Sequence, residues 1–350
     1  MGLDKIRLNS FRCHASTTLS LHPKVNIFLG LNAQGKTSIL EAVHFLCTGR
    51  SFKTTRWKEV LKEGEQNGEV AARVGDNLIQ VKLTGAEKTH FLNRKKVLKR
   101  EEWPLSVAFT THDIQIARGT SAFRRRFLDE LLILLNPNYL GLMNRYARTL
   151  LNRNSLLKKG VQDPRGFQAY TVELISNALP ILQARCDLLP RLSTFARVAY
   201  NKISSSREKL AVRYKDSSMG NLTETFNQQC DEEMRLRQTI AGPHRDDLEL
   251  TLDGRELARY GSEGQQRSVA LAMRLAAWKL LFRKSTGAPL ILFDDVMGEL
   301  DSERRNKLIQ LIGTRAQIFL TATEETWDKT LLPDASRFMV KDGAVEPWGA

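Results

Sequence analysis

Long apolar runs are missing from this chain of 350 residues. A membrane-spanning helix needs about 20 consecutive apolar residues, whereas the longest candidates, residues 131–135 and the run that ends at Phe293, have only the length of core segments. The opening MGLDKI lacks an apolar signal region, and Ile6 stands where a myristoylation signal has Ser or Thr. We therefore expect no membrane association.

Cysteine is also scarce. The four cysteines, Cys13, Cys47, Cys186 and Cys230, lie far apart in the sequence and form no CxxC pair. This spacing argues against a disulfide framework and against a zinc site, and it is typical of a protein in the reducing cytoplasm.

Acidic residues are outnumbered, because 39 Asp and Glu face 53 Lys and Arg, for a net charge of +14. Residues 82–100 hold seven basic residues and one acidic residue, and residues 118–165 hold ten and three. Charged stretches are more often solvated faces, but this concentration favours a polyanionic partner, nucleic acid before an acidic membrane. The candidate DNA contacts are Arg94, Lys95, Lys96, Arg124, Arg125 and Arg126.

Apolar periodicity predicts an α/β module at both ends of the chain. Alternating or continuous apolar patterns predict strands, and amphipathic patterns predict helices. The expected strands are residues 6–11, 17–22, 25–30, 70–74, 78–83, 105–110, 247–252, 289–293 and 317–321, with helices at 38–47, 264–282 and 302–312.

The middle of the chain, residues 121–237, has a helical pattern with few strand signals. An apolar stripe that starts at Phe167 follows steps of three and four residues, as in helix–helix packing. Pro180 and Pro190 interrupt the stripe and argue against one long straight helix. We therefore expect a compact helical insertion.

Residues 30–37, GLNAQGKT, match the phosphate-binding pattern G-x-x-x-x-G-K-[ST] between a buried strand and a helix. The glycines let the backbone turn around phosphate, and the N–H groups of residues 32–37 form an anion nest at a helix N-terminus. Lys36 is expected to reach the β and γ phosphates of ATP, and Thr37 to ligate Mg²⁺. The expected nucleotide-binding residues are Gly30, Leu31, Asn32, Ala33, Gln34, Gly35, Lys36, Thr37 and Ser38.

Residues 290–295, LILFDD, form an apolar strand that ends in two carboxylates. Asp294 at the strand tip is the expected second partner of Mg²⁺, and Asp295 is expected to orient or deprotonate the attacking water. Taken alone, the pair is better explained as a helix cap or a turn after a strand. Together with the phosphate loop, the pair predicts a P-loop hydrolase in which Lys36 and Asp295 are catalytic.

Two further motifs resemble those of ABC-type ATPases. Ser262, Gly264 and Gln265 in YGSEGQQRS resemble the signature motif, which in that class contacts the γ-phosphate held by the other subunit. Residues 298–301, GELD, resemble the D-loop. The resemblance adds the three signature residues to the expected nucleotide site.

The chain as a whole resembles the RecF family of bacterial recombination and repair ATPases, which are related to the SMC proteins. The similar blocks are NSFR…NIFLGLNAQGKTSILEAVHFLCTGRSFKT, FRRRFLDELL, GPHRDDLEL, GSEGQQRSVALAMRLA and ILFDDVMGELD. This resemblance implies a fold with an ABC-type P-loop ATPase head, a mixed sheet with flanking helices, formed by residues 1–118 and 241–350. Residues 119–240 would then form an inserted helical arm.

The same resemblance implies a function. RecF-like proteins bind ATP and double-stranded or gapped DNA, hydrolyse ATP slowly, and dimerise when ATP is bound. They act with RecR and RecO to load RecA at single-strand gaps. The sequence departs from ABC-type ATPases in having Asp295 instead of Glu, residues 321–323 (Thr-Ala-Thr) instead of the switch His, and no evident Gln in residues 110–113. Glu263 stands where the family has Gln.

Several charged residues have two interpretations. Arg124, Arg125 and Arg126 could contact phosphates or form salt bridges with Asp129 or Glu130. Residues 244–247, His-Arg-Asp-Asp, look catalytic but have no nucleophile nearby, which favours turn formation and hydrogen bonding. His44 and Cys47 are expected core residues.

Two other functions remain open at this point. An ATPase subunit of a membrane transporter shares the phosphate loop and signature, although the missing switch His and the basic insertion argue against it. A nuclease with an ATPase head needs a further cluster of carboxylates, and none is convincing in the sequence.

Overall fold

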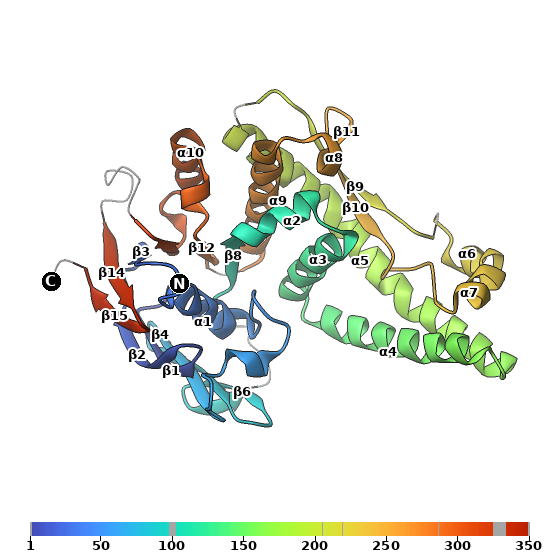
Figure 1. Cartoon of the computed structure of the whole chain (residues 1–350), viewed down its shortest axis with the longest axis horizontal. Coiled ribbons are helices and arrows are strands. Elements are labelled where there is room, and N and C mark those ends of the chain that lie inside the picture. The colour runs from blue at the N-terminus through green and yellow to red at the C-terminus, as the bar shows by residue number, and fades with distance from the viewer. Residues whose placement is uncertain are drawn as a thin grey trace. The chain divides into compact units, whose positions relative to one another are not determined.

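The computed structural model describes residues 2–97, 103–204, 206–218, 220–285, 287–324 and 334–348. Contacts between residues divide the chain into two units, Met1–His112 with Ala277–Ala350, and Asp113–Ala276 (Figure 1). These boundaries, after residues 112 and 276, differ from the expected domain boundaries after residues 118 and 240. Residues 241–276 group with the helical insertion because β10 (Asp247–Leu252) pairs antiparallel with β9 (Leu210–Lys215).

The first unit contains a mixed sheet of six strands. Its order is β15 (Ala344–Pro347), β14 (Ala335–Lys341), β3 (Val25–Leu29), β13 (Ile318–Ala322), β12 (Leu290–Asp294) and β8 (Ser106–Thr110). All neighbouring strands are parallel except the hairpin of β14 and β15. Every residue of β3 and β13 is buried, as expected for strands covered on both faces.

A second sheet in this unit is antiparallel. Its order is β2 (His14–Ser20), β1 (Lys5–Phe11), β4 (Gly68–Val74), β5 (Asn77–Leu83), β6 (Lys88–Leu92) and β7 (Lys95–Val97). Helix α1 (Lys36–Thr48) shares one hydrophobic core with both sheets (Figure 1). Phe45 of α1 packs in that core with Phe11 of β1 and Phe319 of β13. Because α1 is held on both sides, the loop that precedes it has a fixed place.

The other helical segments of this unit are short. They are η1 (Trp57–Val60), η2 (Thr111–Asp113, its last residue in the second unit), η3 (Met297–Glu299), α10 (Ser302–Ile312) and η4 (Gly313–Arg315). The Asp301 side chain caps α10 by accepting a hydrogen bond of 2.8 Å from the Arg304 N–H.

The second unit is built on long helices. They are α3 (Ser121–Leu135), α4 (Asn138–Lys159) and α5 (Pro164–Ser204), with the shorter α2 (Ile114–Arg118), α6 (Leu222–Gln228), α7 (Cys230–Leu236) and α8 (Leu257–Tyr260). A sheet of β11 (Arg255–Glu256), β10 and β9 completes it. The long helix α9 (Glu263–Lys284) begins in this unit and ends in the first.

The expectation that prolines interrupt the arm is wrong. Helix α5 is one continuous helix of 41 residues that contains both Pro180 and Pro190, about 60 Å long at 1.5 Å per residue. A proline inside a helix costs about 3 kcal/mol, but the buried stripe from Phe167 to Ile203 packs along the whole helix and offsets this cost. The strand β9 was also not expected, although Leu210, Val212 and Tyr214 alternate as in a strand.

Candidate nucleotide site

Five parallel strands, β14, β3, β13, β12 and β8, end at one edge of the mixed sheet. The phosphate loop, residues 30–37, follows β3, and Asp294 is the last residue of β12, whose partner β13 holds Thr321 beside it. Ligand sites in open α/β sheets form at the carboxyl ends of the strands. The expected phosphate loop and the expected carboxylates are therefore brought together, as the sequence motifs predict.

The two glycines of the loop occupy places where no side chain fits. Gly30 has φ +147°, and a Cβ there would lie 2.3 Å from the carbonyl oxygen of Val340. Gly35 has φ +107°, and its Cβ would lie 2.7 Å from the Cys13 sulfur. The backbone of the loop is thus packed against β14 on one side and against the β1–β2 turn on the other.

Lys36 is the first residue of α1 and is 3% exposed. Its Nζ donates hydrogen bonds to the carbonyl oxygens of Gly30 (2.7 Å) and Leu31 (2.9 Å). The ammonium group is held inside the loop that the sequence predicts to surround the phosphates. The side chain of Leu31, in contrast, is 75% exposed.

Thr37 and Asp294 form the centre of the site. The Thr37 hydroxyl donates a hydrogen bond of 2.7 Å to Oδ1 of Asp294, and the Thr321 hydroxyl lies 3.1 Å from the same oxygen. Burial raises the pKa of Asp294 and the negative charge of Asp295 adds to this, although the hydroxyl of Thr37 opposes it. A hydroxyl and a carboxylate at this distance form a set of hard oxygen donors that fits Mg²⁺.

Asp295 has φ +55°, in the left-handed region. Its N–H donates a hydrogen bond of 2.9 Å to the hydroxyl oxygen of Thr321, which is fully buried. Thr321 therefore fixes the backbone between the two carboxylates. It belongs to residues 321–323, which stand in place of the switch His of ABC-type ATPases. Periodicity could not have singled out this threonine, because its role depends on the pairing of β12 with β13.

A turn near the C-terminal end of the described chain supports the loop from behind. The N–H of Asp342 donates a hydrogen bond of 2.6 Å to Oε1 of Gln34, and the N–H of Gly343 donates one of 3.1 Å to the Gln34 carbonyl. No sequence motif places this turn beside the phosphate loop. Its only local signal is the Asp-Gly pair, which marks a turn without indicating what the turn contacts.

The signature residues lie in the second unit. The N–H of Ser262 donates to Oε1 of Gln265 (2.7 Å), and the N–H of Gln265 donates to the Ser262 hydroxyl (3.3 Å), which is a capping box at the start of α9. Gly264 lies in the first turn of the same helix. The three residues are thus held together at an exposed helix N-terminus, where backbone N–H groups favour an anion.

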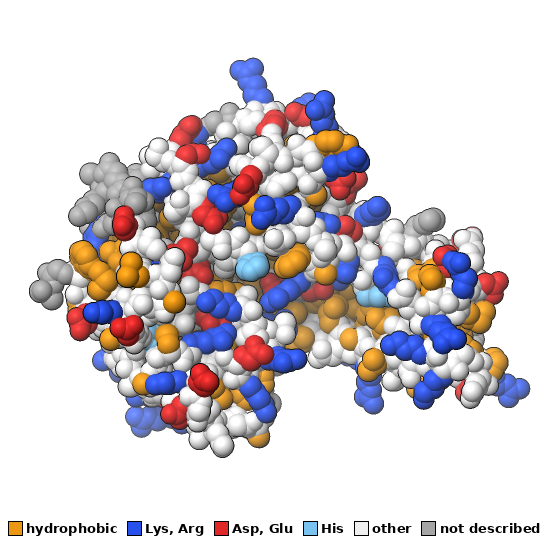
Figure 2. All heavy atoms as spheres, in the orientation of Figure 1, with side chains coloured by type: hydrophobic (Ala, Val, Ile, Leu, Met, Phe, Trp, Pro, Cys, Tyr) orange, Lys and Arg blue, Asp and Glu red, His pale blue; other side chains and the backbone are white. Residues whose placement is uncertain are grey.

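In the first charged stretch, the described residues Lys82, Arg94, Lys95 and Lys96 are exposed, and Lys88 is partly buried. Arg94 lies in the turn between β6 and β7, and Lys95 and Lys96 are the first two residues of β7. Lys99 and Arg100, which belong to the same stretch, lie outside the described residues. On the face drawn in Figure 2, Lys and Arg side chains are spread among Asp and Glu instead of gathering in a single patch.

Arg124, Arg125 and Arg126 of the second charged stretch all contact other residues of the fold, although most basic residues of the stretch are exposed. Arg124 forms two hydrogen bonds with the Asp247 carboxylate (2.7 and 2.8 Å), and Arg125 donates to the carbonyl of Asp246 (2.7 Å). Arg126 pairs with Glu130 at 2.7 Å on the helix surface. These contacts support salt bridging for Arg124 and Arg126, with Asp247 as the unforeseen partner of Arg124, and hydrogen bonding to the backbone for Arg125.

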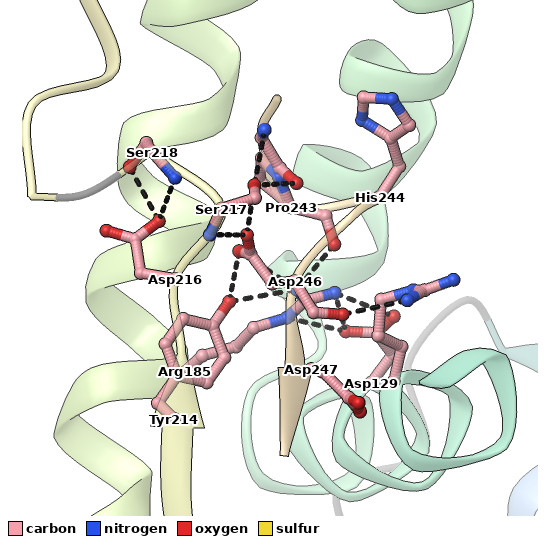
Figure 3. A network of polar contacts seen from close by, with 12 residues as sticks. Asp129, Arg185, Tyr214, Asp216, Ser217, Ser218, Pro243, His244, Asp246 and Asp247 are labelled. Carbon is pink, nitrogen blue, oxygen red and sulfur yellow. Dashed lines mark hydrogen bonds and ion pairs between the residues drawn. The ribbon is translucent and has the colours of Figure 1, made fainter. Parts of the chain in front are cut away.

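Residues 244–247 are structural in their contacts (Figure 3). Asp246 accepts hydrogen bonds from the hydroxyls of Tyr214 (2.5 Å) and Ser217 (2.6 Å). His244 lies 2.6 Å from the Tyr146 hydroxyl, and burial lowers its pKa to about 4. Turn formation and hydrogen bonding, the interpretation favoured from the sequence, account for these residues.

The core predictions for α1 are mixed. Cys47 is buried, whereas His44 is only partly buried and its Nδ1 lies 3.0 Å from the Ser106 hydroxyl.

Among the described residues, no helix combines the length and apolarity needed to cross a membrane.

Comparison with known proteins decides the family. The family described as RecF/RecN/SMC N terminal domain matches residues 2–339. A DNA replication and repair protein RecF of Lactobacillus delbrueckii subsp. bulgaricus is 33% identical to the chain, over 99% of the chain and 97% of the relative. The chain belongs to the RecF family. A RecF protein of Streptococcus pneumoniae is 31% identical, over 98% of both chains.

Solved RecF structures resemble the whole chain. Two structures of the recombination mediator protein RecF in the RecFOR pathway, described as RecF-ATPrS and RecF-ATP, match with TM-scores of 0.88 and 0.85 at 28% identity. Each match covers 99% of this chain and at least 97% of the other. An Smc head domain of Pyrococcus furiosus shares the fold, with a TM-score of 0.53 at 14% identity. The ABC-type ATPase head expected from the sequence is thereby confirmed for this RecF-family chain.

Proposed function

We propose that this protein is an ATP-gated DNA clamp of recombinational repair. Two copies bind Mg-ATP, close on double-stranded or gapped DNA, and help to load RecA in the cytoplasm together with RecR and RecO. Slow ATP hydrolysis, stimulated by DNA, reopens the dimer. The single observation that carries the nucleotide part is the hydrogen bond between Thr37 and Asp294 beside the phosphate loop. The names of the relatives support the repair pathway.

Each nucleotide-site residue of the first unit has a defined role in this proposal. The N–H groups of the phosphate loop and the ammonium of Lys36 bind the triphosphate and offset its charge. Thr37 and Asp294 hold Mg²⁺, which supplies further charge neutralisation when bound. Asp295 orients the attacking water and accepts its proton. The left-handed backbone of Asp295, held by Thr321, sets the direction of that carboxylate.

The second copy completes each site. Ser262, Gly264 and Gln265 of one copy are proposed to bind the γ-phosphate held by the other, so the interface is isologous and contains two equivalent nucleotides. ATP shifts the equilibrium toward closure because these contacts exist only in the closed state. The capping box that joins Ser262 to Gln265 keeps the helix N-terminus ready for an anion.

Net charge gives DNA a second role. Two chains of +14 each repel one another, and two nucleotides offset little of this, whereas duplex DNA carries one negative charge per ~1.7 Å. We therefore expect DNA to lower the protein concentration at which ATP causes dimerisation, most strongly at low salt.

Size-exclusion chromatography with light scattering, with and without ATP and gapped DNA, tests the proposal. A dimer with ATP, formed at lower concentration with DNA, is the expected result. Lys36→Ala is the control, because it should lose ATP affinity and stay monomeric. A wild-type chain that binds ATP and still remains monomeric at high concentration with DNA present would rule out the clamp.

A further inference from the structure

His14 lies between the phosphate loop and the C-terminal turn. It is the first residue of β2, is fully buried, and has one carbonyl oxygen at each ring nitrogen. Nδ1 lies 2.8 Å from the carbonyl oxygen of Gly343, and Nε2 lies 3.2 Å from the carbonyl oxygen of Gly35. The imidazole thus connects two segments that are more than 300 positions apart in the sequence.

The chemistry of these contacts requires two donors. A carbonyl oxygen only accepts hydrogen bonds, and a neutral imidazole has a single N–H. The neutral ring can satisfy either Gly343 or Gly35, and it then turns a nitrogen lone pair toward the other oxygen. Only the imidazolium form donates to both. The hydroxyl of Thr17 lies 3.2 Å from Nδ1 and can donate to it or accept from it, so it does not replace a donor to either carbonyl oxygen.

The charged neighbours of the ring are few. Cys13 precedes it, Asp342 lies in the facing turn, and Lys36 belongs to the facing loop, where its ammonium is turned to the Gly30 and Leu31 carbonyls. Arg12 is paired with Glu41 at 2.6 Å. Cys13 is therefore the group that couples to the imidazole.

The titration of the pair agrees with a charged ring. Burial opposes the imidazolium, but the hydrogen bond and charge of Cys13 and the two carbonyl oxygens outweigh it, so the pKa of His14 lies above its ordinary value. The hydrogen bond with His14 in turn holds the pKa of the Cys13 thiol below its usual range.

The phosphate loop and the C-terminal turn both pack closely against the β1–β2 turn that carries His14. A Cβ on Gly35 would lie 3.2 Å from Nε2 of His14, and a Cβ on Gly343 would lie 2.9 Å from the carbonyl oxygen of Cys13. Both glycines have positive φ and approach the β1–β2 turn with their bare backbones. A displacement of the His14 ring therefore displaces Gly35, the residue that directly precedes α1.

We infer that His14 is a positioning residue of the nucleotide site, whose imidazolium ties Gly35 to Gly343 and holds the phosphate loop in the shape that receives the triphosphate. The inference rests on the proposed binding of ATP by residues 30–37 and adds a residue that no sequence motif contains. His14 acts through the Gly35 carbonyl and not by touching the nucleotide.

The test is the pH dependence of nucleotide affinity, measured with a fluorescent ATP analogue from about pH 5.5 to about pH 8.5. Because only the charged ring donates to both carbonyl oxygens, its effect on affinity should be complete while His14 is protonated and should be lost as pH rises through the pKa of the folded chain, which lies above the ordinary value. His14→Gln keeps one donor and cannot change charge. The γ-phosphate titrates equally with both proteins, so the difference between the two profiles reports on His14.

At low pH, His14→Gln should weaken binding by about three- to tenfold, the effect of losing one charge-assisted hydrogen bond. The difference from the wild type should shrink as pH rises. His22→Gln is the matched control, since His22 lies before β3, at the opposite end of the strand from the loop. Its profile should equal that of the wild type.

Gly343→Ala tests the same link from the other side, and it should also weaken binding because its Cβ meets the Cys13 carbonyl. If His14→Gln and Gly343→Ala both fold and bind as the wild type does at every pH, the inference is wrong. An NMR titration that finds the wild-type ring neutral at pH 6 overturns it even if the variants do not fold. Lys36→Ala separates the two proposals, because unchanged ATP affinity there rejects the nucleotide site itself.

Discussion

The hydroxyl of Thr37 and the carboxylate of Asp294 are joined by a hydrogen bond of 2.7 Å across 257 positions of sequence. Thr37 lies in the first turn of α1, and Asp294 is the last residue of β12. The pair defines where the phosphate loop meets the acidic strand.

Asp294→Asn should stabilise the unliganded protein and impair its Mg²⁺-dependent binding of ATP. Burial raises the pKa of Asp294, so the folded state favours the protonated group, and ionisation destabilises it as pH rises through that value. An amide keeps the bond from Thr37 without the charge. We expect the melting temperature at neutral pH to rise by about 2 °C, the effect of ~1 kcal/mol in a chain of this size. Calorimetry near pH 4 and pH 7 should show a larger gain at the higher pH.

Asp295→Asn should bind ATP and dimerise, but it should hydrolyse ATP at least about 100-fold more slowly, as expected for loss of a general base. Asparagine tolerates the left-handed backbone of this position, so the fold should be unaffected. Single-turnover hydrolysis measures the effect, and an unchanged melting temperature is the control. Turnover equal to the wild type would remove Asp295 from the chemistry.

Ser262→Arg should bind ATP as a monomer and fail to dimerise, because a bulky cation then fills the space proposed for the partner's γ-phosphate. Ser262→Ala is the matched control. It loses the hydrogen bond to the Gln265 N–H, which costs about 1 kcal/mol of helix stability, but adds no bulk. Light scattering with ATP compares the two. Dimerisation of the arginine variant would place the signature outside the interface.

The exposed turn between β6 and β7 should contribute to DNA binding, whereas Arg124 should not. Arg94→Gln and Lys95→Gln should each lower the slope of log affinity against log salt by about 0.9 if each contacts one phosphate. Arg124→Gln breaks the ion pair with Asp247 and should lower the melting temperature without changing that slope. Fluorescence anisotropy on duplex DNA at several salt concentrations measures the slopes. A changed slope for Arg124 alone would reverse the assignment.

Some elements could be predicted because their signals are local. The phosphate loop combines a buried strand, two glycines and a helix start within a few positions, and each expected strand has a counterpart in the structure. The Asp pair after β12 was likewise visible as a polar ending of an apolar run. Short-range steric and periodic rules are sufficient for such features.

Other features depended on partners far along the chain. Thr321 bridges the two carboxylates only because β13 pairs with β12, and Arg124 turns inward only because β10 brings Asp247 to it. The prolines of α5 were judged by their local cost, whereas packing along the whole helix decides the outcome.

The sequence by itself determined the class of protein and the place of the phosphate loop, since backbone freedom, strand polarity and helix dipoles act between neighbours. Only the tertiary structure decided which charges serve the fold, which helix stays continuous, and which buried groups hold the loop from behind. The contacts of the His14 ring could not be predicted from the sequence, because its two hydrogen-bond acceptors belong to Gly35 and Gly343. Hydrogen bonding depends on distance and angle in space and not on separation along the chain.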